Sequence, residues 1–458
     1  MVMARSLILG LSALCIVSSV WALPTSTPEK LQVIRAFAAS PSDVSTIRAL
    51  EKENIKLDFW KDPRLNDHAD IMVDSLNLKK VVSILDKNNI SHHTMIEDVN
   101  SLIAEQERER QEIAANGAQA AGIDWDNYYQ LAEIEGWLDN LSRESSAIEG
   151  WLDNLSRESS AVSIQNIGTS YEGRTLKVAK ISNGSGNSTN KPAILITATI
   201  HAREWIAAAT ATYIIDQLAS NSSAHPDILD LVDFYILPVI NPDGYAYTAS
   251  SRLWRKSRSR GSSSCIGTDG NRNFGYKWGD GDVPGSSGDP CSETYRGSAP
   301  FSERETAAVR DYIESNSNVN WTVYVTFHSY GQYFMSPWGY TRTLPTGYQA
   351  MYFMSPWGYT RTLPTGYQAM KQLSDVAAAA LTAKYGTRYS TGSSANVLYY
   401  TDGTDQDWAF GSGHFPFSYT MELRDTGSYG FLLPARLIKP TAEETFEAIK
   451  TLARNVPK

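Results

Sequence analysis

Long apolar runs alternate with helical patterns in the part of the chain that follows residue 123. The helical segment WIAAATATYIIDQLA (205–219) follows one such run after four residues. The alternation predicts an α/β domain over residues 123–458, with a mixed, mostly buried sheet flanked by helices. Its strand-like runs, nearly all apolar as in strands buried on both faces, are AILITATI (193–200), LVDFYILPVI (231–240), WTVYVTF (321–327) and FSYTMEL (417–423).

A smaller α+β pattern precedes this domain, over residues 23–103. Residues 43–54 and 78–89 have the spacing of amphipathic helices, whereas IKLDFW (55–60) and DIMVD (70–74) predict strands. These elements predict a small separate domain at the N-terminal side.

A charged segment, residues 104–122, connects the two patterns and contains no aromatic residue. We expect a solvated helical connector. Poorly packed charged connectors are where proteases cut, so Arg108 or Arg110 would be open to a trypsin-like enzyme.

Two segments occur as identical tandem copies. IEGWLDNLSRESSA occupies residues 134–147 and 148–161, and YFMSPWGYTRTLPTGYQAM occupies residues 333–351 and 352–370. Solenoids need more copies, and their units usually diverge. Each pair therefore indicates either a recent duplication or an error in the gene model.

The apolar residues of the 14-residue repeat share one helical face. Fourteen residues return this face to within about 40° of its start, so a second copy can extend the helix. We expect a prolonged or broken helix in which one Trp–Leu pair is more exposed than its twin. The face consists of Ile134, Trp137, Leu138 and Leu141, repeated as Ile148, Trp151, Leu152 and Leu155.

The composition excludes several classes of protein. The chain has 458 residues, 42% of them hydrophobic, and a net charge of −9, so it suits a globular fold and lacks the basic excess that nucleic acid binding needs. Residues 1–22 combine Arg5 with an apolar run and small residues, which predicts a signal peptide. No second run of about 20 apolar residues follows, so we expect a secreted protein without a membrane span.

Secretion makes the cysteines informative. Cys15 would leave with the signal peptide, and Cys265 and Cys291 remain as a pair in an oxidising compartment. This pair predicts one disulfide.

Polar residues interrupt the apolar segment at His201 and Glu204, between a predicted strand and a predicted helix. Buried charges are costly without a partner, and a turn can aim both side chains at one metal ion. A catalytic zinc site needs a third ligand. We prefer His328, which ends an apolar strand as His201 does, over His225 and His414 in polar loops.

Three further features carry candidate chemistry. Asn271 and Arg272 are neighbours in a loop, and together they can form a fork for a carboxylate. Glu422 in an apolar strand is either a general base or the partner of Arg424. The basic run RLWRKSRSR (252–260) can be explained without a chemical role, as a solvated face.

The chain resembles a secreted zinc metallocarboxypeptidase of the pancreatic A/B type in its zymogen form. The resemblance implies an eight-stranded carboxypeptidase sheet, an activation propeptide at residues 23–103 and a cleavable segment at residues 104–122. It is carried, in family order, by HAREW, NPDGYAYT, RLWRK, DGNRNF, PCSETYRG, FHSYGQ, YYTDGTDQDW and ELRDTGSYGFLLP.

The resemblance also implies a role for each matching residue. His201, Glu204 and His328 would hold one zinc ion, and Asp269 would orient the first histidine. Glu422 would be the general base. Arg255 would stabilise the oxyanion, and the substrate-binding residues would be Asn271, Arg272, Tyr399, Arg203, Tyr330 and Phe431.

The residue at the specificity position is Gln406, where the family has an aliphatic residue for apolar substrates or an aspartate for Lys and Arg. We expect a preference for neutral, apolar or aromatic C-terminal residues. The alternatives are a B-like preference, since Asp402 and Asp405 are close in sequence, or a non-catalytic relative disabled by the repeats. Met335 and Gly339, rather than their copies, would line the pocket.

The expected partners follow from the same resemblance. They are the C-termini of peptides and proteins, an activating trypsin-like protease and the chain's own propeptide as inhibitor. We expect a monomer that binds neither nucleic acid nor membrane.

Overall fold

The fold is seen in a computed structural model. The predicted signal peptide lies outside the residues that it describes, as does most of the connection between the two 19-residue copies. The described residues are 29–53, 55–115, 122–152, 161–183, 191–261, 263–281, 284–344 and 366–457. No helix among them is long and apolar enough to cross a membrane.

An eight-stranded mixed sheet forms the centre of the larger domain, which confirms the predicted class. Its order is β11-β10-β12-β9-β7-β8-β6-β5, and β7 and β9 pair in parallel at its middle. The strands are β5 (Ala161–Thr169), β6 (Thr175–Ser182), β7 (Pro192–Ala198), β8 (Asp233–Leu237), β9 (Asn320–Ser329), β10 (Tyr333–Ser336), β11 (Ser390–Ser393) and β12 (Phe417–Leu423).

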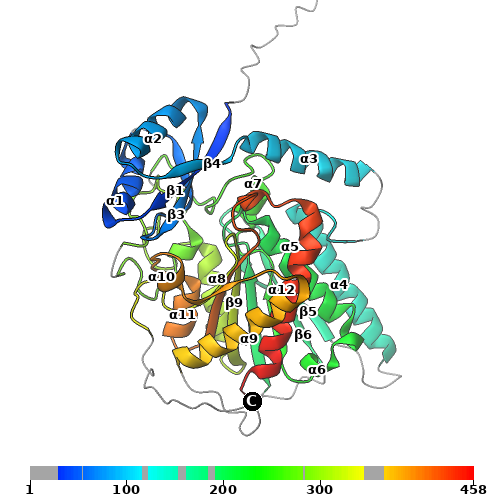
Figure 1. Ribbon diagram of the computed structural model, residues 1–458. Helices are drawn as coiled ribbons and strands as arrows, with labels where there is room; N and C mark the ends of the chain where they lie inside the picture. Colours follow the sequence, from blue (N-terminus) through cyan, green and yellow to red (C-terminus); the bar gives the residue numbers. More distant parts are fainter. Residues whose placement is uncertain are drawn as a thin grey trace, which may run out of the picture.

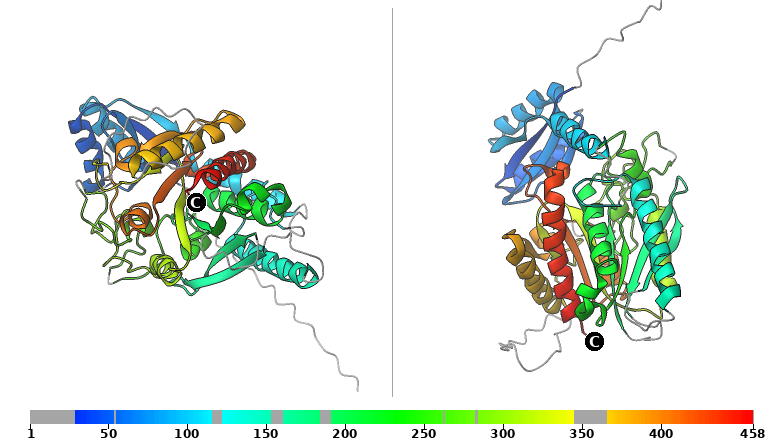
Figure 2. Two further views of the ribbon diagram at one scale, coloured as in Figure 1. Left: turned by 90° about the horizontal axis from the view of Figure 1, so that it is seen from below. Right: turned by 90° about the vertical axis from the view of Figure 1, so that its right-hand side faces the viewer.

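Helices cover both faces of this sheet, as the views in Figures 1 and 2 show. One apolar core joins the sheet to α4 (Leu131–Leu152), α5 (Trp205–Ala219), α9 (Tyr367–Tyr385) and α12 (Ile438–Asn455). A second core joins the other face to α8 (Arg304–Ser315) and α11 (Asp405–Gly411). Short helices follow in the connections: α6 (Pro226–Leu229), α7 (Pro242–Tyr247), α10 (Ser394–Val397), η3 (Ser222–Ala224), η4 (Gly270–Arg272), η5 (Gly430–Leu432) and η6 (Ala435–Leu437).

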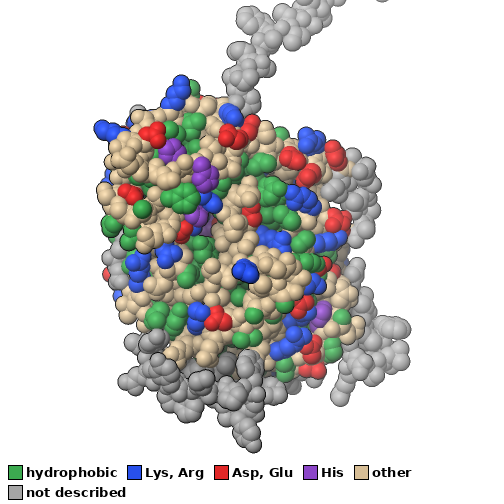
Figure 3. Space-filling model, in the orientation of Figure 1, with side chains coloured by type: hydrophobic (Ala, Val, Ile, Leu, Met, Phe, Trp, Pro, Cys, Tyr) green, Lys and Arg blue, Asp and Glu red, His purple; other side chains and the backbone are tan. Residues whose placement is uncertain are grey.

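The N-terminal part forms a separate four-stranded antiparallel sheet, of order β2-β3-β1-β4, with its own apolar core. It lies above one end of the larger sheet (Figure 1), and the face seen in Figure 3 carries interspersed acidic and basic side chains. Its elements are β1 (Leu31–Ala38), α1 (Pro41–Ala49), η1 (Leu50–Lys52), β2 (Leu57–Lys61), β3 (Asp67–Asp74), α2 (Ser75–Lys87) and β4 (His92–Ile96).

Helix α3 (Val99–Ala115) leads from this small domain toward the larger one. It runs without a break through residue 104, where we placed the start of the connector. Gln106 on α3 is buried, and its side chain accepts a hydrogen bond from Arg252. The connector is therefore packed at this point rather than solvated throughout.

The predicted disulfide between Cys265 and Cys291 is present. In the basic run that precedes it (252–260), Arg252, Arg255 and Lys256 are buried, so the run is not simply a solvated face.

The first copy of the 14-residue repeat packs into the core. Ile134, Leu138 and Leu141 are buried, and Trp137 packs edge-on against Trp125. Helix α4 continues to Leu152, so the second copy prolongs it, as the periodicity predicts. The side chains of that copy lie outside the described residues. The expected difference in exposure therefore stays a prediction.

The 19-residue copies enter the fold at opposite ends. Strand β10 begins at Tyr333 in copy one, and helix α9 begins at Tyr367 in copy two. Residues 345–365, between them, lie outside the described part of the chain. This arrangement agrees with insertion of one extra copy between a strand and a helix.

Because the two 14-residue copies are identical, deleting residues 134–147 or 148–161 yields the same shorter chain. We expect that chain to fold, to keep the activity that the family resemblance implies and to melt at or above the temperature of the full chain, since the remaining copy can take the buried positions. Thermal unfolding and turnover measure this.

A control tests the assignment of the core positions. In the shortened chain, Ile134→Ala should destabilise by about 2–4 kcal/mol, as truncation of a buried side chain does. Loss of folding on the deletion itself would show that both copies belong to the core.

Candidate active site

The candidate metal residues lie where the two central strands end. Strand β7 ends at Ala198, helix α5 begins at Trp205, and the turn between them carries His201 and Glu204. His328 is near the end of β9, the parallel neighbour of β7. The carboxyl ends of parallel strands meet at one edge of a sheet, so the topology brings these side chains together.

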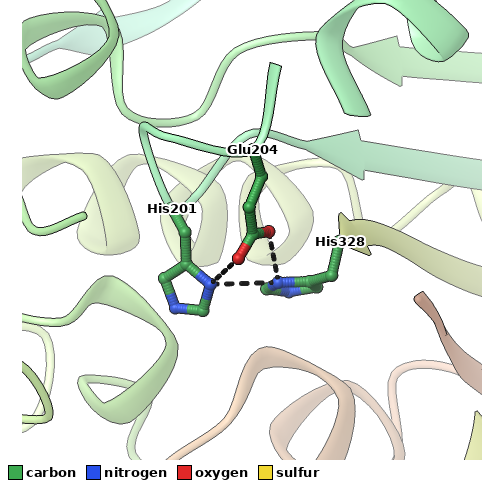
Figure 4. A group of neighbouring side chains, drawn as sticks. All are labelled: His201, Glu204 and His328. Carbon is green, nitrogen blue, oxygen red and sulfur yellow. Dashed lines mark hydrogen bonds and ion pairs between the residues drawn. The ribbon is translucent and has the colours of Figure 1, made fainter. Parts of the chain in front are cut away.

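Figure 4 shows the three side chains pointing at one another. His201 Nδ1 lies 2.8 Å from Glu204 Oε1, and His328 Nδ1 lies 3.0 Å from Glu204 Oε2. The two Nδ1 atoms are 3.1 Å apart. Two ring nitrogens and a carboxylate converging in a buried space match the nitrogen and oxygen ligands of zinc, and the group can hold a metal ion.

The charges within this group depend on one another. Burial alone would raise the pKa of Glu204, but His201 and His328 hold it well below its usual range. Burial alone would lower the pKa of His328, but the Glu204 carboxylate raises it to about 9. The Glu204 carboxylate and the His328 ring therefore stabilise each other's charged forms.

The other two candidate histidines lie away from this group. His225 packs against Phe446, and His414 packs against Trp408. The structure therefore places His328, the preferred third ligand, beside His201 and Glu204.

We call His201, Glu204 and His328 the metal group. Asp269 links its first member, His201, to Arg255. Its Oδ1 lies 3.0 Å from His201 Nε2, and its Oδ2 accepts a hydrogen bond of 2.8 Å from Arg255 Nη2. Burial opposes ionisation, but Arg255 and His201 keep the pKa of Asp269 well below its usual range. An ionised Asp269 places the ring proton on Nε2, which leaves the Nδ1 lone pair of His201 for a metal ion.

Glu422 lies on β12, beside β9 and in register with His328. Burial raises the pKa of its carboxyl, and the charge of Glu204 adds to this while His328 opposes it. The alternative partner Arg424 instead forms an ion pair with Glu444. Glu422 thus faces the metal group without the ion pair that would give it a purely structural role.

The proposed carboxylate fork lies next to the same group. Asn271 Nδ2 is 3.3 Å from His328 Nε2, and Arg272 is buried with its Nε donating to the carbonyl of Gly285. Burial raises the pKa of Tyr399, and the nearby charges of Arg272 and Glu422 act on it in opposite directions. The structure therefore places Asn271 beside His328 and Arg272 next to Asn271, with Tyr399 near enough to feel the charge of Arg272.

The predicted groove residues are covered by the N-terminal domain. Arg203 pairs with Asp58 and lies 4.2 Å from the centre of the Phe431 ring. Trp60 packs against both Tyr330 and Phe431, with ring centres 6.4 and 5.0 Å away. The groove is thus filled by side chains of β2.

Two further contacts come from β3 and from the loop before it. Asp70 accepts a hydrogen bond of 2.8 Å from the Tyr330 hydroxyl, and the Arg64 guanidinium donates to the carbonyls of Asn396 and Val397. The N-terminal domain is therefore bound to the larger domain at Tyr330 and at residues 396–397.

Gln406 lies buried beside Ser394, to whose hydroxyl its amide donates at 2.8 Å. Met335 is buried on β10. Gly339 approaches Thr401 so closely that a Cβ there would lie 2.1 Å from the Thr401 hydroxyl oxygen. The Gln406 amide also lies 3.4 Å from Asp407 Oδ1, so its side chain is held between a hydroxyl and a carboxylate.

The carboxylates nearest to Gln406 in sequence all accept hydrogen bonds from neutral donors. Asp402 accepts hydrogen bonds from the backbone of Gly279 and Gly285, and Asp407 accepts them from Gly339. Asp405 accepts one from the hydroxyl of Tyr324.

Sequence reasoning missed this last bond. Tyr324 and His328 are four residues apart on β9, and alternation along a strand places both on one face. That spacing was the available signal for Tyr324. No local pattern pointed from Tyr324 to Asp405, which lies 81 residues further on.

Comparison with protein families gives two matches. Residues 148–448 match the model described as zinc carboxypeptidase, and residues 34–106 match the model described as carboxypeptidase activation peptide. The two matches fall on the larger and the smaller domain respectively.

Individual proteins agree with these matches. Carboxypeptidase B of Astacus astacus is 45% identical over 338 residues, covering 73% of this chain and 98% of that protein. Carboxypeptidase A2 of Rattus norvegicus is 35% identical over 432 residues, 93% of each chain.

Solved structures share the arrangement of both domains. The crystal structure of thrombin activatable fibrinolysis inhibitor has a TM-score of 0.78 at 29% identity, covering 93% of this chain and 99% of that chain. Carboxypeptidase A from Helicoverpa armigera has the same TM-score at 27% identity, covering 93% of this chain and 97% of that one. The chain belongs to the zinc carboxypeptidase family, and an activation peptide precedes its peptidase domain.

Proposed function

We propose that this protein is a secreted zymogen of a zinc exopeptidase that removes neutral, apolar or aromatic residues from the C-termini of peptides and proteins. The observation that carries the proposal is the buried His201–Glu204–His328 group with Glu422 beside it. These three residues would bind one zinc ion per chain. Family membership makes the protein a peptidase, and the residue roles below are our assignment.

When bound, the zinc ion supplies Lewis acidity to the scissile carbonyl and to water. Glu422 accepts a proton from the attacking water at its carboxylate and later delivers it to the leaving amine. Burial raises the pKa of this carboxyl, which favours a group that both takes and returns a proton. Arg255 donates to the oxyanion that develops in the transition state, where added binding accelerates the reaction.

Asn271 and Arg272 restrict the reaction to chain ends. Their donors, with the hydroxyl of Tyr399, would bind the terminal carboxylate of the substrate in a charge-assisted fork. An internal peptide bond has no carboxylate, so it would leave the charge-assisted bonds of this fork unmade. The position of the terminal carboxylate therefore determines which peptide bond of the substrate is cleaved.

The surroundings of Gln406 support neutral side chains. The three carboxylates near it already accept hydrogen bonds from backbone N–H groups or a tyrosine hydroxyl, so pairing with a substrate cation would compete with these bonds. A cation buried without a counter-charge is strongly disfavoured. Relatives named carboxypeptidase B and carboxypeptidase A2 both match, so a preference for Lys or Arg is the second candidate.

The activation peptide inhibits the peptidase by occupying the substrate groove. Asp58 pairs with Arg203, and Trp60 fills the space between Tyr330 and Phe431. We propose that a trypsin-like protease cuts helix α3 at Arg108 or Arg110 and releases this domain. Secretion is proposed from the sequence of residues 1–22, and we expect the enzyme to act as a monomer.

Glu422→Gln should abolish turnover and keep zinc, because the amide cannot accept the proton and the metal ligands are intact. His328→Ala should lose zinc as well, since it removes a ligand. Metal analysis of the purified variants, together with turnover of a blocked dipeptide, checks both. Zinc at wild-type content in the His328 variant would contradict its assignment as a ligand.

Gln406→Asp should shift the preference toward C-terminal Lys and Arg by about tenfold or more relative to Phe and Leu, because it adds a buried carboxylate. The matched variant Gln406→Leu should raise the rate for apolar residues without this shift. Residues released from a peptide library report the preference. Faster release of Lys and Arg by the unaltered enzyme would favour the B-like alternative.

The uncut chain should be nearly inactive, and trypsin should activate it, because the groove is filled in the intact protein. Arg108→Gln combined with Arg110→Gln should delay activation, whereas the exposed Lys87→Gln should not. Gel analysis and peptidase assays during digestion measure both. Full activity of the intact chain would disprove inhibition by the activation peptide.

A further inference from the structure

A buried chain of hydroxyl and carboxylate groups lies behind the proposed substrate fork. Asp405, the first residue of α11, is fully buried, and its Oδ2 accepts a hydrogen bond of 2.9 Å from the Tyr324 hydroxyl. Its Oδ1 accepts one of 2.7 Å from the backbone N–H of Gln406. The Tyr324 oxygen lies 2.8 Å from Thr197 Oγ1. Since Tyr324 donates to the carboxylate, Thr197 donates to Tyr324.

This chain is anchored in the strands that position the metal group. Thr197 lies on β7, which leads to His201, and Tyr324 lies on β9, which carries His328. Both side chains are completely buried. The Asp405 carboxylate is therefore tied to the rigid centre of the sheet.

The backbone of Asp405 connects to the fork. Its N–H donates to Asn271 Oδ1 at 3.1 Å, which directs Asn271 Nδ2 to the other side, 3.3 Å from His328 Nε2. A rotated amide would present its oxygen to a substrate carboxylate, and two acceptors repel. The orientation of Asn271 thus depends on where Asp405 is held.

A role in packing alone explains this chain poorly. Burial of a carboxylate costs several kcal/mol, and apolar residues of similar volume usually fill a core at least as well. Tyr324 lies within an apolar cluster that includes Trp408 and Phe415, where a phenylalanine would pack equally well. The Tyr324–Asp405 hydrogen bond is thus better explained by its influence on the orientation of Asn271.

We propose that Asp405, held by Tyr324, is a positioning residue for the terminal carboxylate of the substrate. It keeps the Asn271 amide oriented and at a fixed distance from the metal group. The proposal rests on the function proposed above, in which Asn271 and Arg272 bind that carboxylate. It adds two residues to the recognition of the substrate's chain end.

The test uses the trypsin-activated, zinc-loaded enzyme and the simple carboxylate 3-phenylpropanoate as probe. Tyr324→Phe and Asp405→Ala should each weaken binding of the probe about tenfold and raise KM similarly, with kcat within about twofold, because the carboxylate is held in ground and transition states alike. Calorimetry gives the dissociation constant, and steady-state kinetics give kcat and KM.

Matched variants separate positioning from stability. Tyr419→Phe removes another buried hydroxyl of the sheet, which donates to the Met370 carbonyl and lies in the other apolar core. It should lower the melting temperature without changing probe affinity. Asp405→Asn keeps the side-chain volume and one acceptor oxygen, so it should retain more of the affinity than Asp405→Ala, and it provides the measurement if Asp405→Ala folds poorly. The double variant at 324 and 405 should bind the probe no more weakly than the more impaired of the two single variants, since the two residues act as one unit.

The outcomes distinguish the two proposals. If Asn271→Ala weakens the probe but the variants at 324 and 405 change only the melting temperature, this inference is wrong and the proposed function stands. If Asn271→Ala and Arg272→Ala both leave probe affinity unchanged, the fork itself is wrong. A fall in kcat with unchanged KM in Tyr324→Phe would also overturn the inference.

Discussion

The cost of burying charge governs this molecule. His201, Glu204 and His328 lie almost completely buried among apolar strands and helices, where unpaired charges are strongly disfavoured. The structure meets this cost in two ways. The three side chains converge, so that one cation can balance the charge of Glu204. Asp269 pairs with Arg255 and also contacts His201.

The same constraint shapes the surroundings of the site. The central strands β7 and β9 carry the metal group at their ends, and the apolar cores on both faces keep these strands fixed. Precise placement of polar groups requires such a frame, because a displacement of about 1 Å at an active site can cost a hundredfold in rate. The activation peptide contacts the residues that we assign to substrate binding. Asp58 pairs with Arg203, and Trp60 packs against Phe431.

Much of this could be predicted from the sequence, for physical reasons. Strands buried on both faces produce apolar runs, so β7, β8, β9 and β12 were recognisable, as was helix α5. The site residues were identified mainly through their resemblance to a known family. Pairings between distant segments could not be predicted, because they depend on the tertiary fold. Arg424 forms its ion pair with Glu444 rather than with Glu422, and Tyr324 donates a hydrogen bond to Asp405. The packing of Gln106 against Arg252 was likewise invisible in a charged, linker-like segment.

The central claim is that a terminal carboxylate directs cleavage. It is tested most directly with two copies of one peptide, one ending in a free carboxylate and the other in an amide, each incubated with the zinc-loaded, trypsin-treated protein. Mass spectrometry follows the products. The account predicts stepwise loss of residues from the C-terminus of the free acid, with the amide left intact. Equal cleavage of both peptides, or internal fragments from either, would contradict it.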